Sequence, residues 1–115
     1  MLLIALRTLV LLVPVAVFAR YGYRDTKLHF TAGYRPISRV EHGLHNLTGL
    51  CELAMFGFGF ADSAYFLLAA LCVVALGAID EYHFHRDVPA LEADYHAKGH
   101  LALFAFAAIA AAWRI

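Results

Sequence analysis

Histidine and carboxylate side chains concentrate in one stretch of this chain, from Asp80 to His100. The stretch holds four of the seven histidines and five of the nine aspartate and glutamate residues. Imidazole nitrogens bind zinc, copper, iron and nickel, whereas carboxylate oxygens favour harder ions. A mixed set of these ligands predicts a metal site that takes iron, with zinc or manganese as alternatives. The histidines of the stretch are His83, His85, His96 and His100.

Helical spacing places several of these ligands side by side. Glu92, His96 and His100 follow one another at four-residue steps, and residues four apart share one face of a helix. His42 and His45, which are three apart, share a face in the same way. Three converging pairs of histidines, together with nearby carboxylates, are enough for two metal ions and too many for one structural zinc. The alternative is a solvated cluster of histidines at a membrane surface.

The candidate ligands come from three predicted helices. Glu41 stands three residues after Ser38 and fits a capping box, so we favour helix initiation over metal binding for its side chain. Carboxylates beyond those needed as ligands would orient the imidazoles from outside. The predicted ligands are His42, His45, Glu81, His83, His85, Glu92, His96 and His100.

Almost pure hydrocarbon flanks the ligand-rich stretch, with residues 64–79 before it and 101–113 after it. The chain of 115 residues is 63% hydrophobic and 16% charged, whereas soluble domains are about 45–50% apolar and about 25% charged. The excess indicates a chain that is solvated by a lipid bilayer. The formal net charge is zero, so no basic surface indicates a nucleic-acid partner.

The sequence predicts an all-α fold: an integral membrane four-helix bundle with a polar His/Glu-rich cluster at one membrane face. One transmembrane domain is expected over residues 1–115. The first apolar run is expected to be a retained helix rather than a signal peptide, because Arg7 interrupts its apolar core. His29 falls in a polar connection after that run and is expected at the surface. The helices are predicted at about residues 1–19, 38–60, 64–83 and 88–113.

The distribution of cations predicts the orientation in the membrane. The connection from Arg20 to Arg39 carries five cations, and the third connection carries Arg86. Cations favour the cytoplasmic side, so both connections are expected in the cytoplasm and both termini outside, in a bacterial inner membrane. An even number of crossings then brings the histidines of three helices to the same, cytoplasmic face.

Glu52 lies deeper than the histidines, in the middle of the second predicted helix. A carboxylate at such a depth costs about 2.5–3.5 kcal/mol on insertion scales, which makes it a functional candidate. We predict a catalytic role as a proton carrier, or a place among the metal ligands. An ion pair with Arg7 is an equally supported alternative.

The arrangement resembles the histidine-box membrane hydroxylases and desaturases. His96 and His100 form a His-x-x-x-His box, and His42 and His45 form a His-x-x-His box. The resemblance implies two irons at the cytoplasmic ends of transmembrane helices. Those proteins are much longer and carry a His-x-x-His-His box, whereas this chain has no His-His pair.

These observations predict a metal-dependent, di-iron membrane oxidoreductase whose lipid-soluble substrate enters from the bilayer. One alternative is a b-type haem protein for electron transfer, with His45 and His100 as the axial ligands. The other alternative is a small accessory subunit, in which the chain packs within a larger membrane complex or a homo-oligomer.

Overall fold

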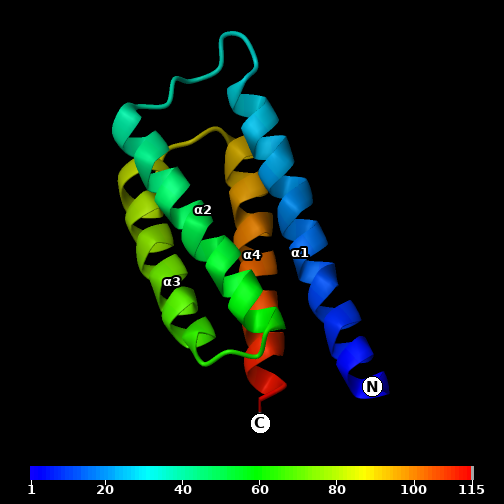
Figure 1. Cartoon of the computed structure of the whole chain (residues 1–115). Coiled ribbons are helices and arrows are strands. Elements are labelled where there is room, and N and C mark those ends of the chain that lie inside the picture. The colour runs from blue at the N-terminus through cyan, green and yellow to red at the C-terminus, as the bar shows by residue number, and fades with distance from the viewer. Residues whose placement is uncertain (115) are drawn as a thin grey trace.

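The computed structural model describes residues 1–114 and contains four α-helices. They alternate in direction, so the C-terminal ends of α1 and α3 lie at the same end of the bundle as the N-terminal ends of α2 and α4 (Figure 1). The predicted all-α architecture of four helices is confirmed. The helices are α1 (Leu2–His29), α2 (Arg39–Phe60), α3 (Tyr65–Phe84) and α4 (Ala90–Ala112).

The bundle consists of two helix pairs. α1 packs along α4, and α2 packs along α3, whereas the two pairs approach each other at few places. The pairing is visible in Figure 1, where α2 and α3 form one side and α4 and α1 the other. The molecule is elongated, with extents of 51 × 23 × 17 Å. Sparse packing between the pairs leaves room between them, and the candidate site lies there.

α1 extends well beyond its predicted end near residue 19 and stops at His29. Tyr21, Asp25 and His29 recur at four-residue steps, and all three side chains contact α4. The Tyr21 ring, for example, lies 6.2 Å from the ring of Tyr95. Packing against α4 therefore continues the helix through a polar stretch, and the first connection is only residues 30–38. The bounds of the other three helices fall within two residues of the prediction.

The apolar core lies in the half of the bundle away from the histidines. Phe106 of α4 is fully buried, and its ring contacts three other phenylalanine rings at centroid distances of 4.8–6.4 Å. These rings are Phe56, Phe60 and Phe66. Clustered aromatic rings bury large apolar areas, so this end of the bundle is the main source of its packing energy.

Arg7 does not pair with Glu52, which was one of the two sequence-based interpretations of Glu52. Its guanidinium instead donates to the carbonyl oxygens of Gly59 (2.5 Å) and Phe60 (3.1 Å), and it lies 3.4 Å from the Asp62 carboxylate. The carbonyl groups at the end of α2 lack helical partners, and a cation there satisfies them. Arg7 therefore caps α2, and the ion-pair interpretation of Glu52 is corrected.

Two of the helices, α1 and α3, are long and apolar enough to cross a membrane, judged by length and composition. Both keep most of their apolar surface outside the bundle. The first halves of α2 and α4 carry histidines and charged residues, which lower the mean hydropathy of these two helices. The same residues build the polar end of the bundle.

Replacing Gly59 by alanine tests the packing around Phe106. A Cβ atom at Gly59 would lie 2.6 Å from Cε1 and 2.7 Å from Cζ of the buried Phe106 ring. We expect Gly59→Ala to lower the free energy of unfolding in detergent by about 1–3 kcal/mol, because the ring has no room to move.

Gly57→Ala is the matched control on the same helix, because a Cβ there meets no atom within 4 Å. It should stabilise the protein by about 0.5–1 kcal/mol, as expected when alanine replaces a helical glycine. Equal unfolding free energies for the two variants would contradict this account of the core.

Candidate metal centre

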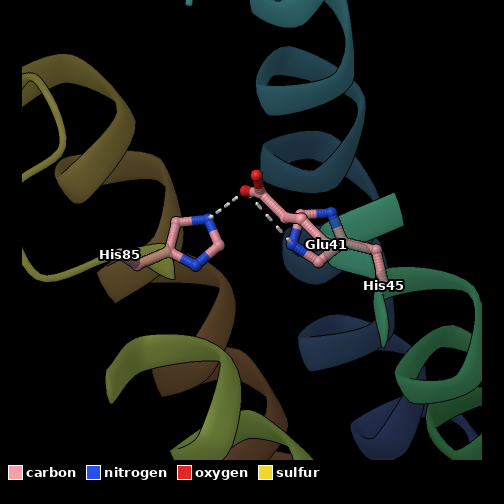
Figure 2. A group of neighbouring side chains, drawn as sticks. All are labelled: Glu41, His45 and His85. Atoms are coloured by element: carbon pink, nitrogen blue, oxygen red, sulfur yellow. Dashed lines mark ion pairs between the residues drawn. The ribbon is translucent and has the colours of Figure 1, made fainter. Parts of the chain in front are cut away.

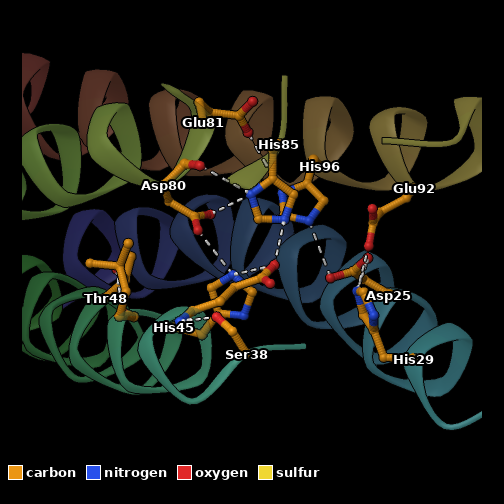
Figure 3. Close-up of polar contacts among 12 residues, drawn as sticks. Asp25, His29, Ser38, His45, Thr48, Asp80, Glu81, His85, Glu92 and His96 are labelled. Carbon is orange, nitrogen blue, oxygen red and sulfur yellow. Dashed lines mark hydrogen bonds and ion pairs between the residues drawn. The ribbon is translucent and has the colours of Figure 1, made fainter. Parts of the chain in front are cut away.

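Imidazole rings from three parts of the chain form a continuous row at the polar end of the bundle. The ring centroids of His45 and His85 lie 5.4 Å apart, those of His85 and His96 lie 4.0 Å apart, and those of His96 and His100 lie 5.9 Å apart. Carboxylates from α1, α2, α3 and α4 surround the row (Figure 3). The histidines of α2, of α4 and of the α3–α4 connection thus lie together at one end, as the antiparallel topology requires.

One group of ligand atoms consists of Glu41, His45 and His85 (Figure 2). Oε1 of Glu41 lies 3.9 Å from Nε2 of His45 and 3.7 Å from Nε2 of His85. These separations are too long for hydrogen bonds. They suit two ligands of one ion, since ligand atoms about 2.1 Å from an ion lie up to about 4.2 Å apart.

Asp80 orients both histidines of this group. Its Oδ2 lies 2.9 Å from Nδ1 of His85, and its Oδ1 lies 3.1 Å from Nε2 of His45. An ionised carboxylate only accepts hydrogen bonds, so the Nδ1–H group of His85 donates to Asp80 and its Nε2 faces Glu41. For His85 this carboxylate lies behind the ring, as the usual second partner of a metal-binding imidazole does. In His45, Asp80 meets the same Nε2 that faces Glu41, so an ion bound there would replace that hydrogen bond.

His85 is almost completely buried, and its Nε2 has no hydrogen-bond partner. Burial lowers the pKa of His85, but the hydrogen bond and the charge of Asp80 outweigh burial, so the pKa lies above its ordinary value. Without a bound ion the ring therefore holds a second proton more readily than free imidazole does. An ion bound at Nε2 would displace that proton.

A second group of ligand atoms consists of Glu81, His96 and His100, and His96 also belongs to one group with Asp80 and His85 and to another with Asp25 and Glu92. The two ring nitrogens of His96 point in different directions, so Asp25 and Glu81 do not face the same ion. Nε2 of His96 lies 3.3 Å from Oδ2 of Asp25, and its Nδ1 lies 3.7 Å from Oε1 of Glu81. The same Glu81 oxygen lies 3.6 Å from Nδ1 of His100. Buried atoms of Asp25, Glu81 and His96 have no hydrogen-bond partner. Buried polar atoms are normally satisfied, so these orphaned atoms fit ligands for a cation.

Arg35, from the connection between α1 and α2, links two buried carboxylates. Its guanidinium donates to Glu92 at 2.9–3.2 Å and to Glu41 at 3.0–3.3 Å. Burial lowers the pKa of Arg35, but the two carboxylates raise it more strongly, so the guanidinium stays charged. Nε2 of His29 lies 2.5 Å from Oε1 of Glu92. Both oxygens of Glu92 thus already accept from Arg35, and Glu92 anchors the site more than it offers a free ligand.

The cluster carries more negative than positive charge. Five carboxylates against one arginine leave four negative charges when the histidines are neutral. Burying uncompensated charge is costly. Two divalent ions would supply four positive charges. The carboxylates are Asp25, Glu41, Asp80, Glu81 and Glu92.

The structure brings six of the eight predicted ligands into the cluster and leaves two outside. His42 and His83 are exposed and belong to none of the ligand groups found among residues 1–114. His42 is turned away from the site because only the neighbouring face of α2 packs against α3. His83 lies in the last turn of α3, whereas His85 follows the helix end and turns inward. The six gathered residues are His45, Glu81, His85, Glu92, His96 and His100.

Four residues of the cluster were not predicted to belong to it, and a fifth was given another role. Asp25 was missed because the first helix was expected to end before it. For the same reason His29 was wrongly expected at the surface, whereas its side chain is only 8% exposed. Asp80 was missed because it comes directly after an apolar run, and only its neighbour Glu81 was predicted to be a ligand. Glu41 was assigned to capping, and its backbone N–H does donate to Ser38 Oγ at 3.1 Å, but its carboxylate is buried in the site. The remaining missed residue is Arg35.

A cavity of about 550 Å³ adjoins the cluster, between the two helix pairs. His45, Asp80, Glu81, His96 and His100 line its polar end. Apolar side chains of all four helices line the rest, among them Phe18, Met55, Val73 and Leu103. Glu52 also lines the cavity, and in the sequence of α2 it lies between His45 and Met55. It belongs to no ligand group in the described part of the chain.

Comparisons of this chain with protein-family models, with curated proteins and with solved structures found no match.

Replacing Arg35 tests its role in holding the cluster. Arg35→Gln leaves Glu41 and Glu92 buried without their cation, so we expect the metal-free protein to lose about 3 kcal/mol of unfolding free energy in detergent. Arg39→Gln, at the exposed start of α2, should change stability by less than about 0.5 kcal/mol. Similar losses in both variants would show that Arg35 does not hold these carboxylates.

Proposed function

We propose that this chain is an integral membrane protein that holds two metal ions, with iron as the favoured metal, and that it acts as an oxidoreductase on a lipid-soluble substrate. The observation that supports this most is the position of the two ligand groups at one end of a largely apolar cavity. An apolar cavity beside a few converging polar groups is the usual form of a small-molecule site.

The outer surface of the bundle supports the membrane part of the proposal. Every helix presents large apolar side chains to the outside, for example Leu12, Leu53, Leu71 and Leu101, which are 47–70% exposed. Soluble proteins rarely expose contiguous apolar surface on this scale, whereas lipid solvates it well. Four spans would then place both termini on one side and the ligand groups at the opposite, cytoplasmic face.

The chemistry of the ligands favours iron. Imidazole nitrogens and carboxylate oxygens contribute in similar numbers, and thiolates do not contribute, since Cys51 and Cys72 lie in none of the groups found among residues 1–114. Such mixed nitrogen and oxygen sets suit iron, manganese or zinc rather than copper(I). Bound iron would supply the one-electron chemistry of an oxidoreductase.

The protein's own residues divide the remaining tasks. Asp80 fixes the rings of His45 and His85, while Arg35 holds Glu41 in place. Glu52 is placed to accept a proton from a molecule in the cavity, because its carboxylate lies on the cavity wall away from the ligand groups.

The haem alternative is less well supported by the same contacts. His45 and His100 both line the cavity, but Nε2 of His45 lies 3.1 Å from Asp80 and Nδ1 of His100 lies 3.6 Å from Glu81. A haem with two axial histidines would leave these carboxylates without a compensating cation, which is costly for buried charge. A Soret band in the purified protein would reverse this ranking.

Metal analysis of purified protein tests the proposal. We expect about two ions per chain in the intact protein, because two divalent charges balance the cluster. His45→Ala and His85→Ala should each remove about one ion per chain or more, since each takes away a nitrogen of the first ligand group.

The exposed histidines provide matched controls for these variants. His42→Ala lies one turn from His45, and His83→Ala lies two residues from His85, and both should keep the full metal content. A metal-free wild-type protein that remains folded and active would rule out the proposal.

Glu52 is separated from the ligands by a second pair of variants. Glu52→Gln should retain about two ions per chain, because Glu52 belongs to no ligand group, whereas Glu81→Gln should lose metal. Elemental analysis of both proteins, prepared side by side, decides the point. Loss of metal from Glu52→Gln would instead place Glu52 among the ligands.

A further inference from the structure

We propose that the cavity between the helix pairs is a binding site for a neutral, hydroxyl-bearing apolar molecule, such as a long-chain phenol or alcohol, that enters from the bilayer between α3 and α4. The inference deepens the proposed function by naming the class of substrate, and its choice of head group rests on the ligand groups described above. Three observations carry it: the way glycines open the cavity, the charge of its wall, and the position of its mouth.

Glycines from three helices open the cavity. Gly22 of α1, Gly77 of α3 and Gly99 of α4 all line it, and a Cβ atom at each would meet no heavy atom within 4 Å. Gly99 is buried, so the empty space beside it is cavity rather than solvent. Close packing therefore does not require these glycines, in contrast to Gly59, whose Cβ would collide with Phe106. A glycine inside a helix destabilises it by about 0.5–1 kcal/mol. Here the loss of stability is accompanied by open space in the cavity, which a ligand can occupy.

The polar end of the cavity selects against anionic molecules. Four carboxylates line the wall, and no lysine or arginine among residues 1–114 does so. Bound ions would balance the carboxylates of the ligand groups, but Glu52 lies outside those groups. Its charge repels an anionic head group where water is scarce, so fatty acids and phosphate esters fit this end poorly. Carboxylates accept hydrogen bonds, and a hydroxyl head group supplies the matching donor. Glu52 is the carboxylate best placed to accept it, because the other three, Asp25, Asp80 and Glu81, belong to ligand groups.

The rest of the cavity suits an apolar body. Phe18, Met55 and Leu103 line this part, and Met55 and Leu103 belong to the buried core. The volume of about 550 Å³ falls within the range of roughly 300–1,000 Å³ that is typical of small-molecule sites. A molecule with one polar head and an apolar body of moderate length therefore matches both ends.

The mouth of the cavity lies between α3 and α4. Val74 of α3 and Phe104 of α4 both line the cavity, yet they are 52% and 60% exposed on the outside of the bundle. α3 and α4 belong to different helix pairs and have little contact with each other. Because the surface around these two side chains is apolar, the opening would face lipid, and a molecule dissolved in the bilayer would reach the cavity without crossing water.

Photoaffinity labelling tests this inference on the full chain in phosphatidylcholine nanodiscs. The probe is 4-octylphenol with a diazirine in its alkyl chain, and labelled residues are mapped by mass spectrometry. We expect labels on the cavity-lining segments of α2, α3 and α4. Gly77→Leu and Gly99→Leu should each reduce labelling about tenfold or more, because a leucine side chain fills the space that the ligand needs.

Gly43→Leu and Gly57→Leu are the matched controls. Both glycines have room for a Cβ but lie on exposed positions outside the cavity, so labelling should stay at the wild-type level. Unlabelled 4-octylphenol in excess should suppress labelling. A diazirine derivative of octanoate, which carries a charged head, should label the cavity residues about tenfold less.

The outcomes separate this inference from the proposed function, because metal content is measured on the same samples. Unchanged labelling in folded Gly77→Leu and Gly99→Leu overturns the cavity site, whatever the metal content. Should both variants fail to fold, labelling of the wild type that excess 4-octylphenol does not suppress overturns it equally. Equal labelling by the octanoate probe overturns the assigned ligand class. Cavity labelling in a protein without metal supports the binding site and contradicts the metal centre.

Discussion

The contact of Arg35 with Glu41 and Glu92 holds the polar end of this bundle together. Glu41 belongs to α2 and Glu92 to α4, so one guanidinium joins the two helix pairs where they otherwise approach each other at few places. The same cation offsets part of the negative charge gathered there. With Arg35 in place the pairs need no close apolar contact at this end, which leaves the cavity open. The opposite end, where Phe106 lies at the centre of the aromatic core, supplies the packing.

In the proposed membrane topology, the two ends of the bundle would meet different solvents. Apolar packing and the capping of α2 by Arg7 stabilise one end, and the other end gathers groups that would be costly in lipid unless they were paired. Polar groups near a membrane face can exchange protons and ions with water. Apolar walls one or two turns deeper can receive molecules from the bilayer. The proposed site would need both water and lipid, and Glu52 lines the cavity between the polar and apolar regions.

The sequence predicted the four helices and the meeting of histidines at one end, because apolar run lengths and helical spacing are local properties. It did not predict which face of each helix turns inward. His42 and His45 differ by less than one turn, as do His83 and His85, and only packing between helices distinguishes them. Asp25 and His29 were missed because a polar, charged stretch resembles a connection until α4 is present to pack against it. The two roles of Glu41 also need coordinates, because its backbone caps the helix while its carboxylate turns into the site.

The two ligand groups belong largely to different helix pairs, and this links ion binding to the assembly of the bundle. Glu41, His45 and His85 come from α2 and the end of α3, whereas His96 and His100 come from α4. Glu81 of α3 reaches across to His96 and His100. An ion in the second group therefore joins the pairs just as Arg35 does. A ligand that binds only the assembled state stabilises that state, so ion binding at the proposed metal centre and the docking of the helix pairs would stabilise each other. Polar contacts, rather than apolar packing, would then hold the two pairs together at this end, which accounts for the loose packing between them.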